Sequence, residues 1–186
     1  MRFKVLVILV LLFLISNHAI ANNIAPKGSF FNVDSLKKIV ALEPVGETRF
    51  SFLFWDIYQS KLQTSSGQYP VDIEKGSIFY EIQYSIDITQ ENLLESTVEQ
   101  WQHIGISANV YQKYITELSA IWPDISEGDT LALFVQANHS RFYFNGEYIG
   151  KIVEPAFAVD FLAIWLSEKT SEPELRRELL GEVNDE

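Results

Sequence analysis

Apolar and polar residues alternate most clearly from Ile78 to Ile86, where even-numbered positions are apolar and most odd-numbered positions are polar. A period of two is typical of a strand with one buried face. An earlier run, Thr48 to Gln59, carries apolar side chains on both faces, with the acidic Asp56 as an exception. This run predicts one long central strand that is covered on both sides.

The pattern then changes to the period of helices. Apolar residues recur every three or four positions after Thr89, which suits an N-cap, and we expect this helix to end at Gly105. A second helix, with a nearly continuous apolar stripe, is expected to begin at Ser107. It stops before Pro123, because proline lacks the amide hydrogen that a helix uses.

A second β region follows these two helices. We predict strands over Thr130–Gln136, Arg141–Phe144 and Glu147–Lys151, with a turn at 137–140 between the first two. Asn145-Gly146 joins the last two, because a type I′ hairpin turn needs positive φ at both of its central positions.

Two further helices complete the pattern. The first starts at Pro155 and is apolar around most of its circumference, which predicts that it is buried. The second begins at a capping box, Ser171 to Glu174, and ends at Gly181. Strands and helices therefore come in separate runs, which predicts an α+β fold with helices packed on one face of a large antiparallel sheet.

The first 21 residues have the layout of a signal peptide. Arg2 and Lys4 precede an unbroken apolar run of 11 residues, Val5 to Ile15, and Ala19-Ile20-Ala21 fits the small-x-small cleavage rule. The alternative is a membrane anchor, but a span needs roughly 20 apolar residues. We therefore expect an exported protein, periplasmic or secreted, without a stable membrane span after cleavage.

The rest of the chain divides simply. We expect a lead-in over residues 22–41, one domain over 42–181 and an acidic tail over 182–186. Loss of the leader changes the formal charge from -11 to -13, because Arg2 and Lys4 leave with it. A negative charge of this size opposes binding to nucleic acid.

Composition removes several kinds of chemistry. The chain has no cysteine and three histidines, one of them in the leader. This excludes disulfides, thiol catalysis and cysteine-ligated metals, and it argues against a site with several histidines. We predict no metal and no cofactor, although His103, at the end of a helix, leaves haem ligation open.

Several segments together resemble the chalcone isomerase-like family, and in particular its exported bacterial branch. They are residues 45–50, 54–58 with Leu62, 80–86, 101–106, 128–129, 145–150, 157–166 and 175–181. Their order and spacing carry the resemblance over about residues 42–181. The resemblance implies an open-faced β-sandwich, a large antiparallel sheet with helices on one face.

The plant enzymes of this family close a flavanone ring without a cofactor. The resemblance places their threonine on Leu53, their tyrosine on Thr89 and their asparagine on Ser96. Their arginine falls near Phe50, so that Arg49 matches with a shift of one. Ring closure needs a base or an ordered water and a donor to the enolate oxygen. At most one of the four polar groups is present, so we expect no plant-type activity and name no catalytic residue.

Non-catalytic plastid members of the family bind fatty acids with such an arginine. By this resemblance Arg49 is a candidate anchor for a carboxylate, with Tyr58, Tyr84 and Trp101 as further candidate ligand-binding residues. The alternative is a surface arginine paired with Glu47 or another acid, and Asp56 has Arg49 or Lys61 as possible partners.

Three functions remain open. The first is an exported, non-catalytic domain that binds a small apolar or amphipathic carboxylate such as a fatty acid. The second is a cofactor-free isomerase or lyase in which Arg49, Tyr58 or Tyr84 takes part. The third is an envelope module that binds an unknown protein partner through an exposed apolar patch.

Overall fold

A computed structural model describes residues 40–182, and the α+β fold expected from the sequence is confirmed. Its strands are β1 (Glu43–Phe52), β2 (Trp55–Thr64), β3 (Ser77–Tyr84), β4 (Thr130–Gln136), β5 (His139–Phe144) and β6 (Glu147–Ile152). Its helices are α3 (Gln90–Ile104), α4 (Ala108–Ile121), α5 (Phe157–Leu166) and α6 (Pro173–Leu179). The expected leader 1–21, nearly all of the lead-in and most of the acidic tail lie outside the described residues.

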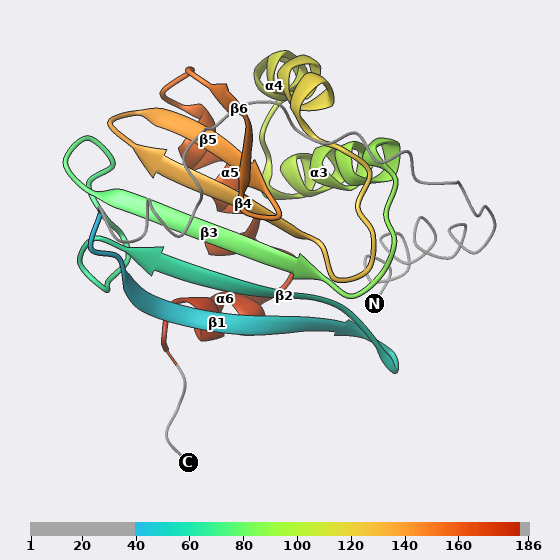
Figure 1. The fold of residues 1–186 in the computed structure, drawn as a ribbon, viewed down its shortest axis with the longest axis horizontal. Coiled ribbons are helices and arrows are strands. Elements are labelled where there is room, and N and C mark those ends of the chain that lie inside the picture. The colour runs from blue at the N-terminus through green and yellow to red at the C-terminus, as the bar shows by residue number, and fades with distance from the viewer. Residues whose placement is uncertain (1–39, 183–186) are drawn as a thin grey trace.

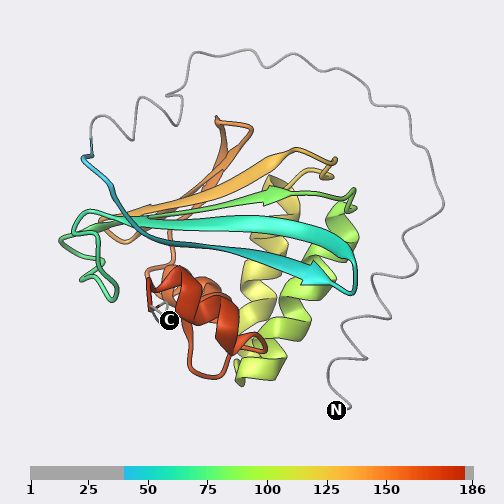
Figure 2. The same ribbon diagram turned by 90° about the horizontal axis from the view of Figure 1, so that it is seen from below.

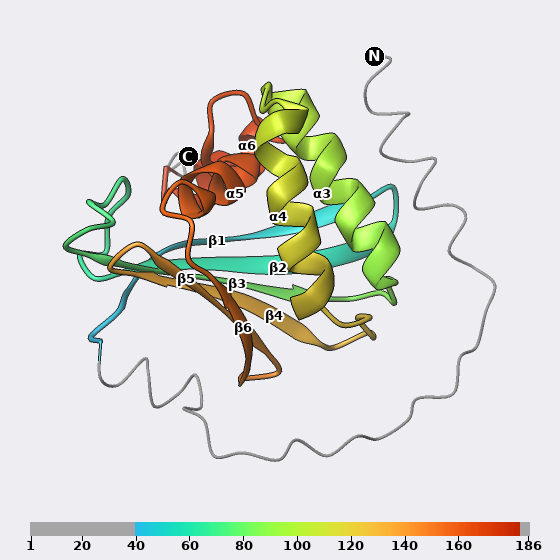
Figure 3. The same ribbon diagram turned by 90° about the horizontal axis from the view of Figure 1, so that it is seen from above.

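The strands form one antiparallel sheet in chain order, β1 to β6 (Figure 1). Figures 2 and 3 show the described helices on one side of this sheet. This is the open-faced arrangement that the resemblance implied. No helix within residues 40–182 is long and apolar enough to cross a membrane.

The prediction of one long strand over residues 48–59 is wrong. The chain turns at Leu53-Phe54, and β1 and β2 pair with each other as a hairpin in which Phe50 lies opposite Tyr58. Leu53 takes the turn with a φ of 55°. Because this turn contains no glycine, proline or asparagine, the apolar run across it had the pattern of a continuous strand.

The alternation of β3 places two sets of side chains on opposite faces of the sheet. Tyr80 and Tyr84 belong to the main core under the helices. Phe79 belongs to a smaller cluster with Ala132, Phe134 and Tyr143, against which Val40 and Leu42 pack. The sheet is thus apolar on the helix-covered face and, near its centre, on the other face as well.

The local signals for the first two helices are mostly confirmed. Asn92 donates its backbone N–H to the Thr89 hydroxyl at 3.3 Å, and Gly105 ends α3 with a φ of 90°. Ser107 stands at the N-cap of α4 without a side-chain cap bond.

The predicted capping box at Ser171 is wrong. Glu172 is the N-cap of α6 and makes no side-chain cap bond. Ser171 instead donates its hydroxyl to the Gln100 amide oxygen on α3 at 3.0 Å. A tertiary contact has therefore taken the side chain that the local pattern assigned to the cap.

Candidate functional site

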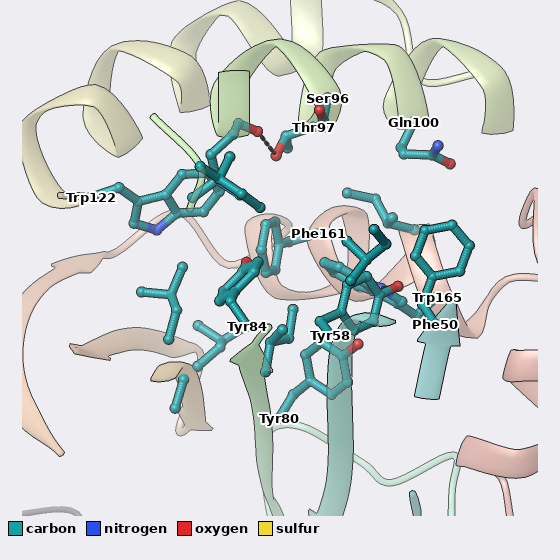
Figure 4. A pocket seen from close by; sticks show the side chains of 18 of the residues that line it. Phe50, Tyr58, Tyr80, Tyr84, Ser96, Thr97, Gln100, Trp122, Phe161 and Trp165 are labelled. Carbon is teal, nitrogen blue, oxygen red and sulfur yellow. Dashed lines mark hydrogen bonds between the residues drawn. The ribbon is translucent and has the colours of Figure 1, made fainter. Parts of the chain in front are cut away.

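The candidate cavity lies between the helix-covered face of the sheet and helices α3 and α5, and its volume is about 160 Å³. It is lined largely by aromatic and aliphatic side chains from β2, β3, β4, β5, α3 and α5. Figure 4 shows Tyr58, Tyr80 and Tyr84 rising from the sheet towards α3, with Trp122 and Trp165 at its sides. Enclosure by apolar side chains with few polar groups is typical of a small-molecule site.

Strand pairing brings the tyrosines together. Tyr58 on β2 lies directly opposite Tyr84 on β3, and their ring centroids are 6.3 Å apart. Tyr80, four residues before Tyr84, faces the same side because side chains alternate along a strand. The Trp165 indole N–H donates to the Tyr58 hydroxyl at 3.1 Å, which links the sheet to α5.

These tyrosines stay protonated near neutral pH. Desolvation raises the pKa of Tyr58 to about 12, although the hydrogen bond from Trp165 opposes the shift. Burial also raises the pKa of Tyr80 and of Tyr84. Their hydroxyls can therefore act as hydrogen-bonding groups but not as bases at neutral pH.

Two polar atoms in the cavity wall lack a hydrogen bond of normal geometry. The Tyr80 hydroxyl and the Trp122 indole N–H are buried without a hydrogen-bond partner in the part of the chain that the structure describes. The Ser60 hydroxyl on the neighbouring strand also lacks such a bond, but it lies near enough to the Tyr80 hydroxyl to lower the pKa of that tyrosine, against the larger effect of burial. Such groups each cost about 1–3 kcal/mol. An oxygen of a bound molecule would offset this cost by accepting a hydrogen bond from Trp122 or Tyr80.

A row of polar side chains on α3 forms one edge of the cavity. Asn92, Ser96 and Gln100 are spaced by four residues, so they lie on one helix face, and all three are partly exposed. Ser171 and Glu172 continue this edge from the loop before α6. Among the cavity-lining residues within 40–182, only Glu172 carries a formal charge at neutral pH.

The structure divides the predicted site residues into three groups. Tyr58 and Tyr84 line the cavity. Trp101 is fully buried in the adjacent aromatic core, donates its indole N–H to the Asp160 carbonyl at 2.8 Å and contacts the cavity residue Phe161. Arg49 does not line the cavity: Phe50 lines it, so Arg49 faces the other side of the sheet.

Arg49 forms an ion pair with Asp56, which agrees with the sequence-based alternative of a surface arginine paired with an acid. Its guanidinium donates to the Asp56 carboxylate at 3.0 Å, and the two side chains are 55% and 45% exposed. A hydrogen bond from the Ser51 hydroxyl at 2.6 Å, followed by the Arg49 charge, lowers the pKa of Asp56. The arginine therefore belongs to a surface ion pair on the outer face of the β1–β2 hairpin.

Sequence reasoning missed much of the cavity wall. Trp122 was part of a helical stripe, and Trp165 part of a buried helix, so neither differed from an ordinary core residue. The spacing of Asn92, Ser96 and Gln100 was visible in the sequence as a polar row on an otherwise amphipathic helix. That row was the one available signal for the rim.

A second hollow of about 420 Å³ lies between residues 69–74 and the first half of α5. Its lining includes Asp72 and Glu74 but none of the buried unpaired polar atoms of the described chain. Those unpaired atoms distinguish the first cavity as the candidate site. Within residues 40–182, no three or more histidine or acidic side chains gather as a metal site would require.

Comparisons with known proteins agree with this fold. The sequence matches the family described as "Chalcone isomerase-like" over residues 48–181. A protein of Haemophilus influenzae, described as uncharacterized, is 20% identical over 141 residues, which cover 76% of this chain and 69% of that protein.

Among solved structures, a fatty-acid binding protein of Arabidopsis thaliana is similar, with a TM-score of 0.58 and 12% identity, over 76% of this chain and 87% of that one. At this identity the likeness shows the fold alone. The family match covers well over half of the sequence, and this chain therefore belongs to the chalcone isomerase-like family.

Proposed function

We propose that this protein binds, without catalysis, a small and largely apolar molecule with one polar end, such as a fatty acid. The observation that carries this proposal is the apolar cavity in which Trp122 and Tyr80 present unpaired polar atoms. Buried polar groups without partners are rare in folded proteins, and a bound molecule that forms hydrogen bonds with them is one explanation. The structural likeness to a plant fatty-acid binding protein supports the same class of function.

The size of the cavity limits what it can enclose. A dry cavity of about 150 Å³ is large enough for a benzene-sized guest, and this cavity is about 160 Å³. It would enclose a ring or part of an acyl chain. A longer chain would extend through the polar edge formed by Ser96, Gln100 and Ser171.

The charge of the wall bears on the polar end of the ligand. The sequence-based hypothesis placed a carboxylate on Arg49, but Arg49 lies on the outer face with Asp56. The charged group that does line the cavity is Glu172, which repels an anion. We therefore propose that a bound acid keeps its carboxylate in water at the rim or binds in its protonated form.

The raised tyrosine pKa values support binding over catalysis. An isomerase or lyase needs a base whose pKa lies near the working pH. Tyr58, with a pKa of about 12, and Tyr84, also raised, are poor candidates, and Arg49 does not reach the cavity. The cavity offers hydrogen bonds and apolar contact, which suffice for binding.

We further propose that the protein is exported, on the strength of the sequence pattern of residues 1–21. Intact-mass measurement of protein recovered from the cell envelope tests this directly. A mature chain that starts at Asn22 agrees with the proposal, and one that starts at Met1 contradicts it.

Ligand binding is tested with a matched pair of probes. Dodecanoic acid and 1-dodecanol share a chain length but differ in charge, and each is added to the purified protein at pH 8 while its Tm is followed. We expect a concentration-dependent rise in Tm that is larger for the alcohol, because a ligand that binds only the folded state stabilises it. No rise with either probe would refute the proposed function.

Two variants locate the site. Trp122→Phe removes the unpaired indole N–H while keeping an aromatic ring, and we expect it to reduce the shift in Tm. The control, Trp101→Phe, changes a tryptophan whose N–H is already paired with Asp160 and which does not line the cavity. Equal loss of the ligand response in both variants would contradict the assignment.

A further inference from the structure

The end of the β1–β2 hairpin carries the most exposed apolar side chains of the described structure. Leu53, Phe54 and Trp55, which we call the apolar tip, are 75%, 97% and 71% exposed. Figures 1 and 2 show this hairpin at the edge of the sheet, with its end directed away from the body of the domain. Three consecutive side chains of this size on a projecting turn form a patch that marks an interaction site.

The hairpin that bears the tip has a formal charge of -1, because Glu43, Glu47 and Asp56 outnumber Arg49 and Lys61. Lys61 pairs with Glu47 at 3.2 Å, and Arg49 pairs with Asp56 at 3.0 Å. The chain as a whole has a formal charge of -11. Attraction to an anionic surface is therefore absent, and whatever binds the tip must gain from apolar burial.

The tip is continuous with the ligand cavity. Phe52 pairs with Trp55 next to the turn, and Phe50 and Tyr58 form the next inward-facing pair of the hairpin. The Phe50 and Tyr58 rings lie 5.4 Å apart, and both side chains line the cavity. Apolar side chains thus lead from the water-exposed turn to the site proposed above.

We propose that the apolar tip inserts into the interfacial layer of an uncharged, zwitterionic phospholipid bilayer, where the cavity takes up or releases its amphipathic ligand. The ligand part of this inference rests on the proposed function; the membrane part does not.

Three observations favour a bilayer over a protein partner. The tip is convex, so it fits a soft, fluid surface. Its tryptophan and phenylalanine are residues that the membrane interface favours. The cavity next to the tip suits a molecule that partitions into lipid.

Trp55 supplies the measurement. Of the four tryptophans, Trp101 and Trp122 are buried and Trp165 is partly buried, whereas Trp55 is 71% exposed. The full chain is mixed with vesicles of phosphatidylcholine, without added ligand, and its emission and acrylamide quenching are recorded. Insertion predicts a blue shift, less quenching by acrylamide and quenching by lipids brominated near the headgroup.

The test variant is the double substitution Leu53→Ser and Phe54→Ser, which keeps Trp55 as the reporter. We expect vesicle partitioning to fall at least about tenfold, because each large apolar side chain contributes strongly to transfer from water. The control is Val153→Ser with Val159→Ser, which removes exposed apolar side chains elsewhere. Both proteins are checked for an unchanged Tm, since none of the altered side chains is buried.

The outcomes separate the alternatives. Partitioning that the tip variant loses and the control keeps supports the proposal, and replacing part of the phosphatidylcholine with phosphatidylglycerol should not increase it. No partitioning, equal partitioning of the tip variant, or binding only to anionic vesicles overturns it. A further outcome is that the wild type self-associates in ultracentrifugation and does not bind vesicles, while the tip variant remains monomeric. That result assigns the tip to contact with a second copy of the chain and overturns the membrane proposal.

Failure of this inference can be told from failure of the proposed function. Ligand binding is measured in solution with short-chain probes and no vesicles, whereas insertion is measured with vesicles and no ligand. A tip variant that still responds to 1-dodecanol but no longer partitions supports both proposals at once.

Discussion

The hairpins at the two edges of the sheet are built by different rules. At the β5–β6 turn, Asn145 and Gly146 adopt φ values of 49° and 83°, and the Asn145 side chain accepts from the Thr130 N–H at 2.9 Å and donates to Asp129 at 2.8 Å. At the β1–β2 turn, a leucine takes the positive φ and its neighbours are exposed apolar side chains.

The two turns differ in whether the requirements of folding explain their residues. The β5–β6 turn has residues that suit its backbone, so folding alone accounts for them. Folding accounts poorly for the β1–β2 turn, and the cavity beside it has buried polar atoms without partners. Residues that break local rules without an evident structural gain are expected at functional sites.

The largest stability effect should come from the turn that folding explains. Gly146→Val places a β-branched side chain at a φ of 83°, and we expect a loss of about 1–3 kcal/mol in the free energy of unfolding by urea. Phe54→Val, at the second position of the other turn, is the control. An equal loss in both would mean that the two turns do not differ in this way.

Placing turn-forming residues at the β1–β2 turn should preserve stability and remove the membrane contact. Leu53→Asn with Phe54→Gly supplies residues that accept positive φ, so we expect the free energy of unfolding to be unchanged or to rise by up to about 1 kcal/mol. Vesicle partitioning should fall at least about tenfold, because the apolar side chains are gone. A clear loss of stability would show that the tip serves folding.

The unpaired hydroxyl of Tyr80 gives a smaller effect. Tyr80→Phe removes a buried hydroxyl that makes no hydrogen bond of normal geometry and has the Ser60 hydroxyl as its neighbour, so we expect the unliganded protein to keep its stability or gain up to about 1 kcal/mol. Ligand affinity should decrease in the same variant. Thermal unfolding with and without 1-dodecanol checks both, and a marked loss of stability without ligand would indicate a structural role for the hydroxyl.

The smallest effect should come from the ion pair on the outer face of β1 and β2. The pKa of Asp56 is lowered in the folded state, so its contribution to stability is present above the unfolded pKa and is lost as the pH falls through the folded one. Asp56→Asn should remove this small pH dependence and, because the pair is exposed, leave ligand binding unchanged. Urea unfolding at pH 7 and pH 3 measures the stability, and the shift in Tm with 1-dodecanol measures the ligand response. A reduced ligand response in Asp56→Asn would contradict the placement of Arg49 outside the site.

Much of the fold follows from patterns that act locally. Three local signals are confirmed by the structure. They are the alternation over β3, the positive φ at the Asn145-Gly146 turn, and the hydrogen bond to the Thr89 cap. The β1–β2 turn could not be predicted in this way, because Leu53 and Phe54 are apolar residues in a position usually taken by turn formers.

The cavity was harder to predict than the fold. Apolar positions indicate which side chains face inward, but they do not say whether those side chains fill the space. Trp122 would have the same place in the sequence pattern in a filled core. The position of Arg49 depends on the alternation within a hairpin whose turn was missed, so its side of the sheet could not be deduced.

The central claim is that the cavity binds a small amphipathic molecule, and a variant that fills the cavity tests it most directly. Ser96→Trp places a large ring on the face of α3 that lines the cavity, whereas Ser119→Trp places the same ring on the exposed surface of α4. The measurement is the shift in Tm produced by 1-dodecanol. We predict a shift in the wild type and in Ser119→Trp that is lost in Ser96→Trp, and an undiminished shift in Ser96→Trp would contradict the account.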